Sequence, residues 1–153
     1  MKLAEALLLR SDMQIKLASL QQRINSNVMI QEGDEPSEDP TSLIQEATAL
    51  NTELYLLIER IHRTNALAKT EQGTAIIHLL SQRDALTSQH RILQQAIDNT
   101  RRENGRYSSS EIRWVKTVSV ADLQKQADQI SQKLRQNNLE IQASNWQIDL
   151  VEI

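Results

Sequence analysis

Turn-forming residues are scarce in this chain, whose 153 residues include only three glycines and two prolines. Glycine and proline most often interrupt regular structure, so long uninterrupted elements must make up most of the fold. A β-sandwich or barrel of this length would need many more turns. The interior must be filled by aliphatic side chains, because aromatic residues make up 3% of the chain and Phe is missing. The sequence therefore predicts an all-α protein.

Apolar residues recur every three or four positions in four segments, which is the period of one helix face. The predicted helices span residues 2–28, 42–69, 74–100 and 119–149. The predicted connections are an acidic loop at 31–40 and an irregular segment at 101–118 that looks β-like around 106–118. We expect a single domain over residues 1–153. Because the apolar stripes are narrow, the long antiparallel helices should form a bundle or coiled-coil-like assembly, part of whose seam a second copy completes.

Composition argues against several classes of protein. The formal net charge of −3 disfavours a nucleic-acid binder, which usually carries a basic excess. The chain has no cysteine, which excludes disulfides and thiolate metal sites and fits a cytoplasmic location. No segment approaches the roughly 20 apolar residues that a membrane-spanning helix needs, so we do not expect membrane association.

Polar residues interrupt the apolar stripes at positions where the 3–4 spacing calls for a buried side chain. Arg10, Asn65, Arg83 and His90 fall on such positions, as do Asn137 and Ser144 or Asn145. A buried Arg needs a carboxylate or carbonyl partner. The candidate polar seam with its acidic partners comprises Arg10, Asp12, Arg60, Asn65, Arg83, Asp84, His90 and Glu111. These residues either fix helix register and oligomeric state, which we favour, or line a pocket for an anionic ligand.

Templates for catalysis and metal binding are not met, so we predict no catalytic residue, cofactor or metal ion. Glu59 and His62 have the Glu-x-x-His spacing of a di-metal helix motif, but the second copy that this motif requires is missing. The acidic loop at 31–40 is interpreted as a connector rather than a cation site, since its spacing does not match an EF-hand. There is no glycine-rich phosphate loop and no nucleophile elbow.

One segment combines basic and aromatic residues, namely Arg101, Arg102, Arg106, Tyr107, Arg113, Trp114 and Lys116. Such a segment can stack on nucleic-acid bases or anchor a subunit interface. The acidic net charge favours the interface. The candidate interface residues are Tyr107, Ile112, Trp114 and Trp146.

Several short motifs occur in order along the chain: 1–7 (MKLAEAL), 10–12 (RSD), 60–65 (RIHRTN), 83–86 (RDAL), 106–112 (RYSSSEI) and 145–150 (NWQIDL). Together they resemble the septicolysin-like family of small all-helical bacterial proteins, a domain of unknown function. The resemblance implies homo-oligomers with an even number of subunits, such as hexamers, and no established activity.

We therefore expect a structural or assembly homo-oligomer without catalytic activity. One alternative is a pore-forming, membrane-active protein of septicolysin type. The other is an anion-binding protein or enzyme that uses buried Arg/Asp pairs.

Overall fold

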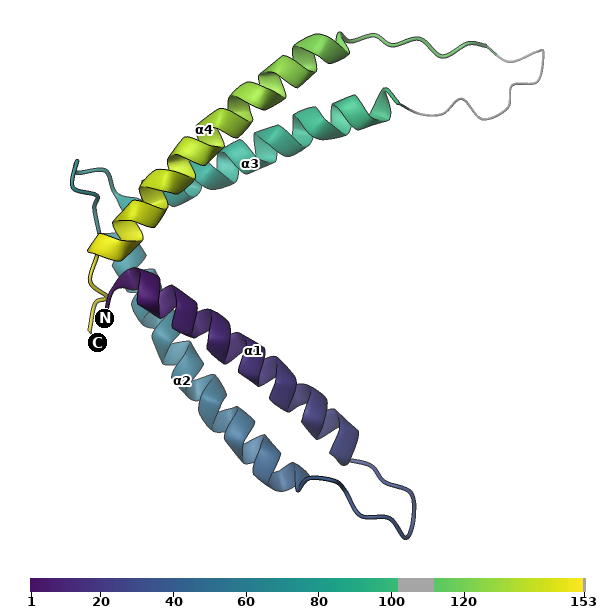
Figure 1. Cartoon of the computed structure of the whole chain (residues 1–153), viewed down its shortest axis with the longest axis vertical. Coiled ribbons are helices and arrows are strands. Elements are labelled where there is room, and N and C mark those ends of the chain that lie inside the picture. The colour runs from purple at the N-terminus through teal and green to yellow at the C-terminus, as the bar shows by residue number, and fades with distance from the viewer. Residues whose placement is uncertain (102–111, 153) are drawn as a thin grey trace. The chain divides into compact units, whose positions relative to one another are not determined.

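The structure, a computed structural model, describes residues 1–101 and 112–152. In that part of the chain it contains the helices α1 (Leu3–Asn27), α2 (Pro40–Leu67), α3 (Ile76–Asn99) and α4 (Val120–Gln147) (Figure 1). Each helix boundary lies within two residues of the predicted one. The all-α prediction is confirmed.

The segment between α3 and α4 is irregular where the structure describes it. Residues 112–119 belong to no helix and no strand, so the β-like alternative is wrong for these positions. The earlier part of that prediction, residues 102–111, lies outside the described residues. Elsewhere in the described chain, β pairing is limited to two isolated bridges, Lys2 with Asp149 and Lys69 with Ala75.

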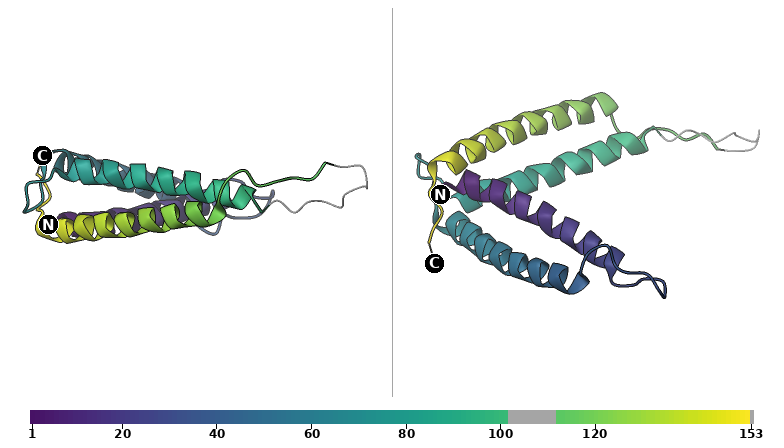
Figure 2. Two further views of the ribbon diagram at one scale, coloured as in Figure 1. Left: turned by 90° about the horizontal axis from the view of Figure 1, so that it is seen from above. Right: turned by 60° about the horizontal axis from the view of Figure 1, so that its bottom comes forward.

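The chain divides into two compact units. The first comprises Met1–Ile76 and Gln142–Ile153, and the second comprises Ile77–Ile141. The prediction of a single domain stays a prediction. In the first unit α1 runs alongside α2, and in the second α3 runs alongside α4 (Figures 1 and 2).

In the first unit the two helices face each other along stripes of strict 3–4 spacing. The α1 stripe is Leu3, Ala6, Arg10, Met13, Leu17, Leu20, Ile24 and Asn27, all buried or half-buried. The α2 stripe is Leu43, Ala47, Leu50, Leu54, Leu57, Ile61, Thr64 and Ala68, again buried or half-buried. One buried cluster forms around Leu20, Leu43 and Ala47, near the loop that joins the helices. Burying a Leu or Ile side chain contributes roughly 1.5–3 kcal/mol, so these stripes hold the pair together.

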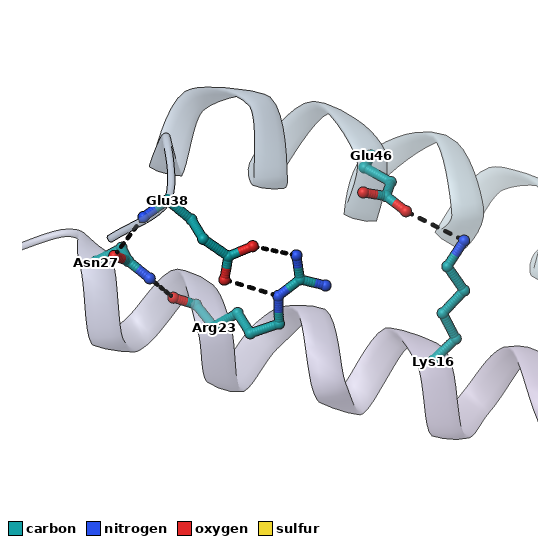
Figure 3. A network of polar contacts seen from close by, with 5 residues as sticks. All are labelled: Lys16, Arg23, Asn27, Glu38 and Glu46. Carbon is teal, nitrogen blue, oxygen red and sulfur yellow. Dashed lines mark hydrogen bonds and ion pairs between the residues drawn. The ribbon is translucent and has the colours of Figure 1, made fainter. Parts of the chain in front are cut away.

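The acidic loop is fastened to α1 by side chains (Figure 3). Arg23 forms an ion pair with Glu38, with its Nε 2.9 Å from Glu38 Oε2. The buried Asn27 side chain accepts a hydrogen bond from the Glu38 N–H at 3.1 Å and donates one to the Arg23 carbonyl at 2.8 Å. Lys16 and Glu46 form a further ion pair between α1 and α2 at 3.1 Å. These contacts fasten the loop to the end of α1 at Glu38. The interpretation of the loop as a connector rather than a cation site stays a prediction.

α2 begins where the sequence offers both a cap and a proline. The Asp39 carboxylate accepts hydrogen bonds from the backbone N–H groups of Thr41 and Ser42, both at 3.2 Å, and from the Ser42 hydroxyl at 2.7 Å. These donors lower the pKa of Asp39, because they stabilise its ionised form. Pro40 occupies the first turn, where its missing N–H costs nothing.

The second unit repeats the 3–4 pattern with more polar residues in it. The buried or half-buried stripe of α3 runs through Leu79, Arg83, Leu86, His90, Leu93 and Ile97. That of α4 runs through Leu123, Ala127, Ile130, Leu134, Asn137 and Ile141. Asn137 Nδ2 donates a hydrogen bond to the Leu79 carbonyl at 3.1 Å and so links the two helices.

Candidate functional site

In the first unit, side-chain hydrogen bonds and an ion pair surround two backbone segments that lie far apart in sequence. Residues 1–3 pair with residues 148–150: the Leu3 N–H donates to the Ile148 carbonyl at 2.9 Å, and the Leu150 N–H donates to the Met1 carbonyl at 2.9 Å. We call the side chains and backbone around this pairing the clasp, and define it by Lys2, Arg60, Thr64, Asp149 and Val151.

Two side chains of α2 bind the backbone of Val151, which follows the paired residues 148–150. Arg60 Nε donates a hydrogen bond to the Val151 carbonyl at 3.0 Å, while the Thr64 hydroxyl accepts one from the Val151 N–H at 3.0 Å. The same hydroxyl donates to the Arg60 carbonyl at 2.7 Å. Thr64 is fully buried, so its hydroxyl needs these partners.

Lys2 completes the clasp at the end of α4. Its Nζ donates to the carbonyl of Gln147, the last helical residue, at 3.0 Å, and lies 2.8 Å from Asp149 Oδ1. A cation at this position satisfies a carbonyl that the helix leaves free and interacts favourably with the helix dipole. The hydrogen bond from Lys2 lowers the pKa of the Asp149 carboxyl.

A hydrophobic cluster lies next to the clasp. Its buried members are Leu3, Ala6, Leu57, Ile61 and Leu150, with Leu7, Met13 and Ile148 packed against them. Three motifs of the sequence analysis, 1–7, 60–65 and 145–150, therefore meet here. The polar groups of the clasp are paired with one another, so the arrangement holds segments together and presents no nucleophile with an adjacent base.

Among the residues that the structure describes, no predicted Arg/Asp pair lies buried in the interior. Arg83 pairs with its neighbour Asp84 at 3.4 Å; the Arg83 side chain is half-buried and the Asp84 side chain is largely exposed. Arg10 is half-buried on the α1 stripe, and its Nε is buried without a hydrogen-bond partner among the described residues. Asp12 is exposed. Arg60 binds a backbone carbonyl instead of a carboxylate. The interpretation of these residues as an anion pocket stays a prediction.

The other polar residues predicted on the apolar stripes are buried or half-buried, as their spacing predicts. On α2, however, the fully buried polar position is one residue earlier than predicted. His90 is half-buried, and Asn137, Ser144 and Asn145 are buried. On α2 the fully buried polar residue is Thr64, while the predicted Asn65 next to it is half-buried. Thr64 was missed although the strict alternation from Leu57 through Ile61 leads to position 64.

The predicted interface residues that the structure describes lie open to solvent. Ile112 is 92% exposed and Trp114 75% exposed, and Trp146 is also exposed. The fourth interface candidate, Tyr107, lies outside the described residues, as does Glu111 of the candidate polar seam. That Tyr107, Ile112, Trp114 and Trp146 form an interface stays a prediction.

Residues 1–101 and 112–152 contain neither a cluster of metal-ligating side chains nor a helix that could span a membrane. In that part of the chain no group of three or more His, Asp or Glu side chains is placed to hold a metal ion. None of the helices described is both long enough and apolar enough to cross a bilayer.

Comparisons with known proteins agree with the fold and name no activity. A family described as being of unknown function, DUF6847, matches residues 10–150. The crystal structure of a functionally unknown conserved protein from Corynebacterium diphtheriae is similar, with 35% sequence identity, a TM-score of 0.88 and 99% of each chain covered. No curated protein matches the chain. The chain therefore belongs to the family of unknown function DUF6847.

Proposed function

We propose that the protein is a structural subunit that assembles with copies of itself through the outer faces of its helices. The observation that carries this proposal is a second apolar stripe on α1. Leu8 and Ile15 are 60% and 67% exposed and lie seven residues apart. Each follows a stripe residue, Ala6 or Met13, by two positions, which at about 100° per residue places it on the opposite side of the helix.

α4 has the same arrangement. The exposed Leu139 and Trp146 lie seven residues apart, and each follows a buried stripe residue, Asn137 or Ser144, by two positions. Large apolar residues that recur every seven positions are typical of a coiled-coil seam. A helix in a two-helix hairpin is covered on one side by its neighbour, so a second apolar seam is buried only by a further helix. This supports the prediction of a homo-oligomer.

Light scattering coupled to size-exclusion chromatography tests the proposal on the whole chain at micromolar concentration. We expect the wild-type protein to elute as an oligomer. The double variant Leu8→Glu, Ile15→Glu should dissociate, because carboxylates in a helix–helix contact lose their solvation. A wild-type protein that is monomeric throughout this range contradicts the proposal.

The matched control is the double variant Gln14→Glu, Gln21→Glu. It adds the same charge to α1 at the same spacing of seven, also at exposed positions, but at least about 100° around the helix from Leu8 and Ile15. We expect this control to remain an oligomer. Far-UV circular dichroism should give equal helix content for both variants, which separates loss of assembly from loss of folding.

We propose a cytoplasmic location for the assembly. Membrane damage is a second candidate function, which the septicolysin-like resemblance suggests. The exposed Trp114 favours it, because Trp is enriched at membrane–water interfaces. Release of a dye from liposomes, with Trp114→Ser as the comparison, tests this candidate. Dye retention with anionic and neutral lipids alike would remove it.

A further inference from the structure

Two exposed segments of this chain have complementary chemistry. The acidic tip, residues 28–35, is the first part of the loop between α1 and α2 and contains three carboxylates and no cation. The basic tip, residues 112–118, precedes α4 and contains two cations and no carboxylate. Each tip therefore carries charges of a single sign, negative in the acidic tip and positive in the basic tip, next to apolar side chains.

The apolar residues of the two tips are unusually exposed. In the acidic tip Met29 is 86% exposed, and Val28 and Ile30 beside it are about half exposed. In the basic tip the side chains of Ile112, Trp114, Val115 and Val118 are exposed. Such large apolar residues are often buried, and several exposed ones beside charged residues in one short segment indicate an interaction surface.

We propose that the basic tip of one copy binds the acidic tip of a second copy. The inference rests on the proposed self-assembly and names the contact that mediates it. Charge complementarity selects the occupant: Arg113 and Lys116 attract carboxylates, and Glu32, Asp34 and Glu35 supply them in a segment that also exposes apolar side chains. A second copy carries both halves of the contact, so the contact needs no other protein.

The two kinds of side chain have different tasks in this contact. Trp114 and Met29, with their apolar neighbours, supply most of the affinity, because buried aromatic and Met side chains concentrate at the centre of interfaces. The charges at the rim steer association and exclude wrong partners, and salt screens them. Association should therefore weaken as the salt concentration rises.

Charge reversal tests the contact by sedimentation of the full chain over a range of concentrations. One variant carries Arg113→Glu and Lys116→Glu, and the other carries Glu32→Lys and Glu35→Lys. Each alone should raise the dissociation constant of self-association at least about tenfold, because like charges then face each other. The two variants mixed in equal amounts should associate as the wild type does, since each then meets a complementary tip. The matched control, Arg91→Glu with Lys133→Glu at exposed positions of α3 and α4 outside both proposed contacts, should leave association unchanged.

The outcomes separate this contact from the proposed assembly. A monomeric wild-type protein overturns both. An oligomeric wild-type protein whose association survives both charge reversals overturns the contact alone, and assembly through Leu8 and Ile15 then stands. Loss of association that mixing does not restore also overturns the contact, because it shows that the tips do not face each other between copies.

Discussion

Thr64 and Arg60, one turn apart on α2, bind the two backbone polar groups of the same residue, Val151. The Thr64 hydroxyl accepts from the Val151 N–H at 3.0 Å, and Arg60 Nε donates to the Val151 carbonyl at 3.0 Å. These two helical side chains thus make the hydrogen bonds to Val151 that the backbone of a neighbouring β-strand would make in a sheet. They satisfy both backbone groups of an irregular segment that lies beside a hydrophobic cluster.

Replacing Thr64 by Val should therefore lower the free energy of unfolding by about 1–3 kcal/mol, because the Val151 N–H loses its buried acceptor. Urea denaturation measures this change. Thr48→Val is the matched control, since Thr48 makes the same hydroxyl bond to the carbonyl four residues earlier, at 2.8 Å, but is exposed on α2. A loss as small as that of the control would show that the clasp does not stabilise the fold.

Replacing Asn137 by Leu should raise the free energy of unfolding, by about 1 kcal/mol. Asn137 is buried, and its Oδ1 has no hydrogen-bond partner among the described residues. An apolar side chain of similar size removes that unsatisfied group. The neighbouring Asn138→Leu is the control, because Asn138 is exposed on the same helix. If Asn137→Leu destabilises relative to this control, the bond to the Leu79 carbonyl outweighs the unpaired oxygen.

The turn between α2 and α3 needs a glycine. Gly73 has φ +87° and lies in a turn where its N–H donates to the Thr70 carbonyl at 2.9 Å. A Cβ there would meet no atom within 4 Å, so the cost of a substitution comes from the backbone alone. We expect Gly73→Ala to lower the thermal midpoint, with a penalty of about 1–2 kcal/mol. Gln72→Ala in the same turn should leave the midpoint nearly unchanged, and equal midpoints for the two variants would contradict the prediction.

The Arg23–Glu38 pair should stabilise the fold in a pH-dependent way. The hydrogen bond from Arg23 lowers the pKa of Glu38 below its ordinary value of 4.5 in the folded protein. The stabilisation is therefore complete above the unfolded-state pKa and is lost as the pH falls through the lowered folded-state pKa.

A double-mutant cycle of Arg23→Gln and Glu38→Gln measures this coupling without contributions from other carboxylates. Denaturation at low salt and pH 7 should give a favourable coupling energy, which should decline once the pH drops below about 4.5. A coupling that stays constant down to pH 2 would contradict the assignment. Added salt should weaken the coupling, because both side chains are partly exposed.

Much of the fold could be predicted because it depends on residues close together in sequence. The 3–4 spacing of Leu20, Ile61 and Ile97 with their neighbours defines which face of each helix is buried. The shortage of glycine and proline defines how long the helices are. The same spacing correctly placed Asn137 in the interior, since helix geometry alone decides which residues share a face.

The clasp was decided by tertiary structure. It joins Arg60 and Thr64 to Val151 across 91 and 87 positions, and its bonds end on backbone groups of Val151. Every residue carries such backbone groups, so no pattern in the sequence marks the one that a distant side chain will bind. The hydrogen-bond partner of each predicted arginine could not be read from the sequence either. Periodicity places Arg10 on a buried stripe. Only the packing of the helices decides whether a carboxylate, a carbonyl or no partner lies within reach of its side chain.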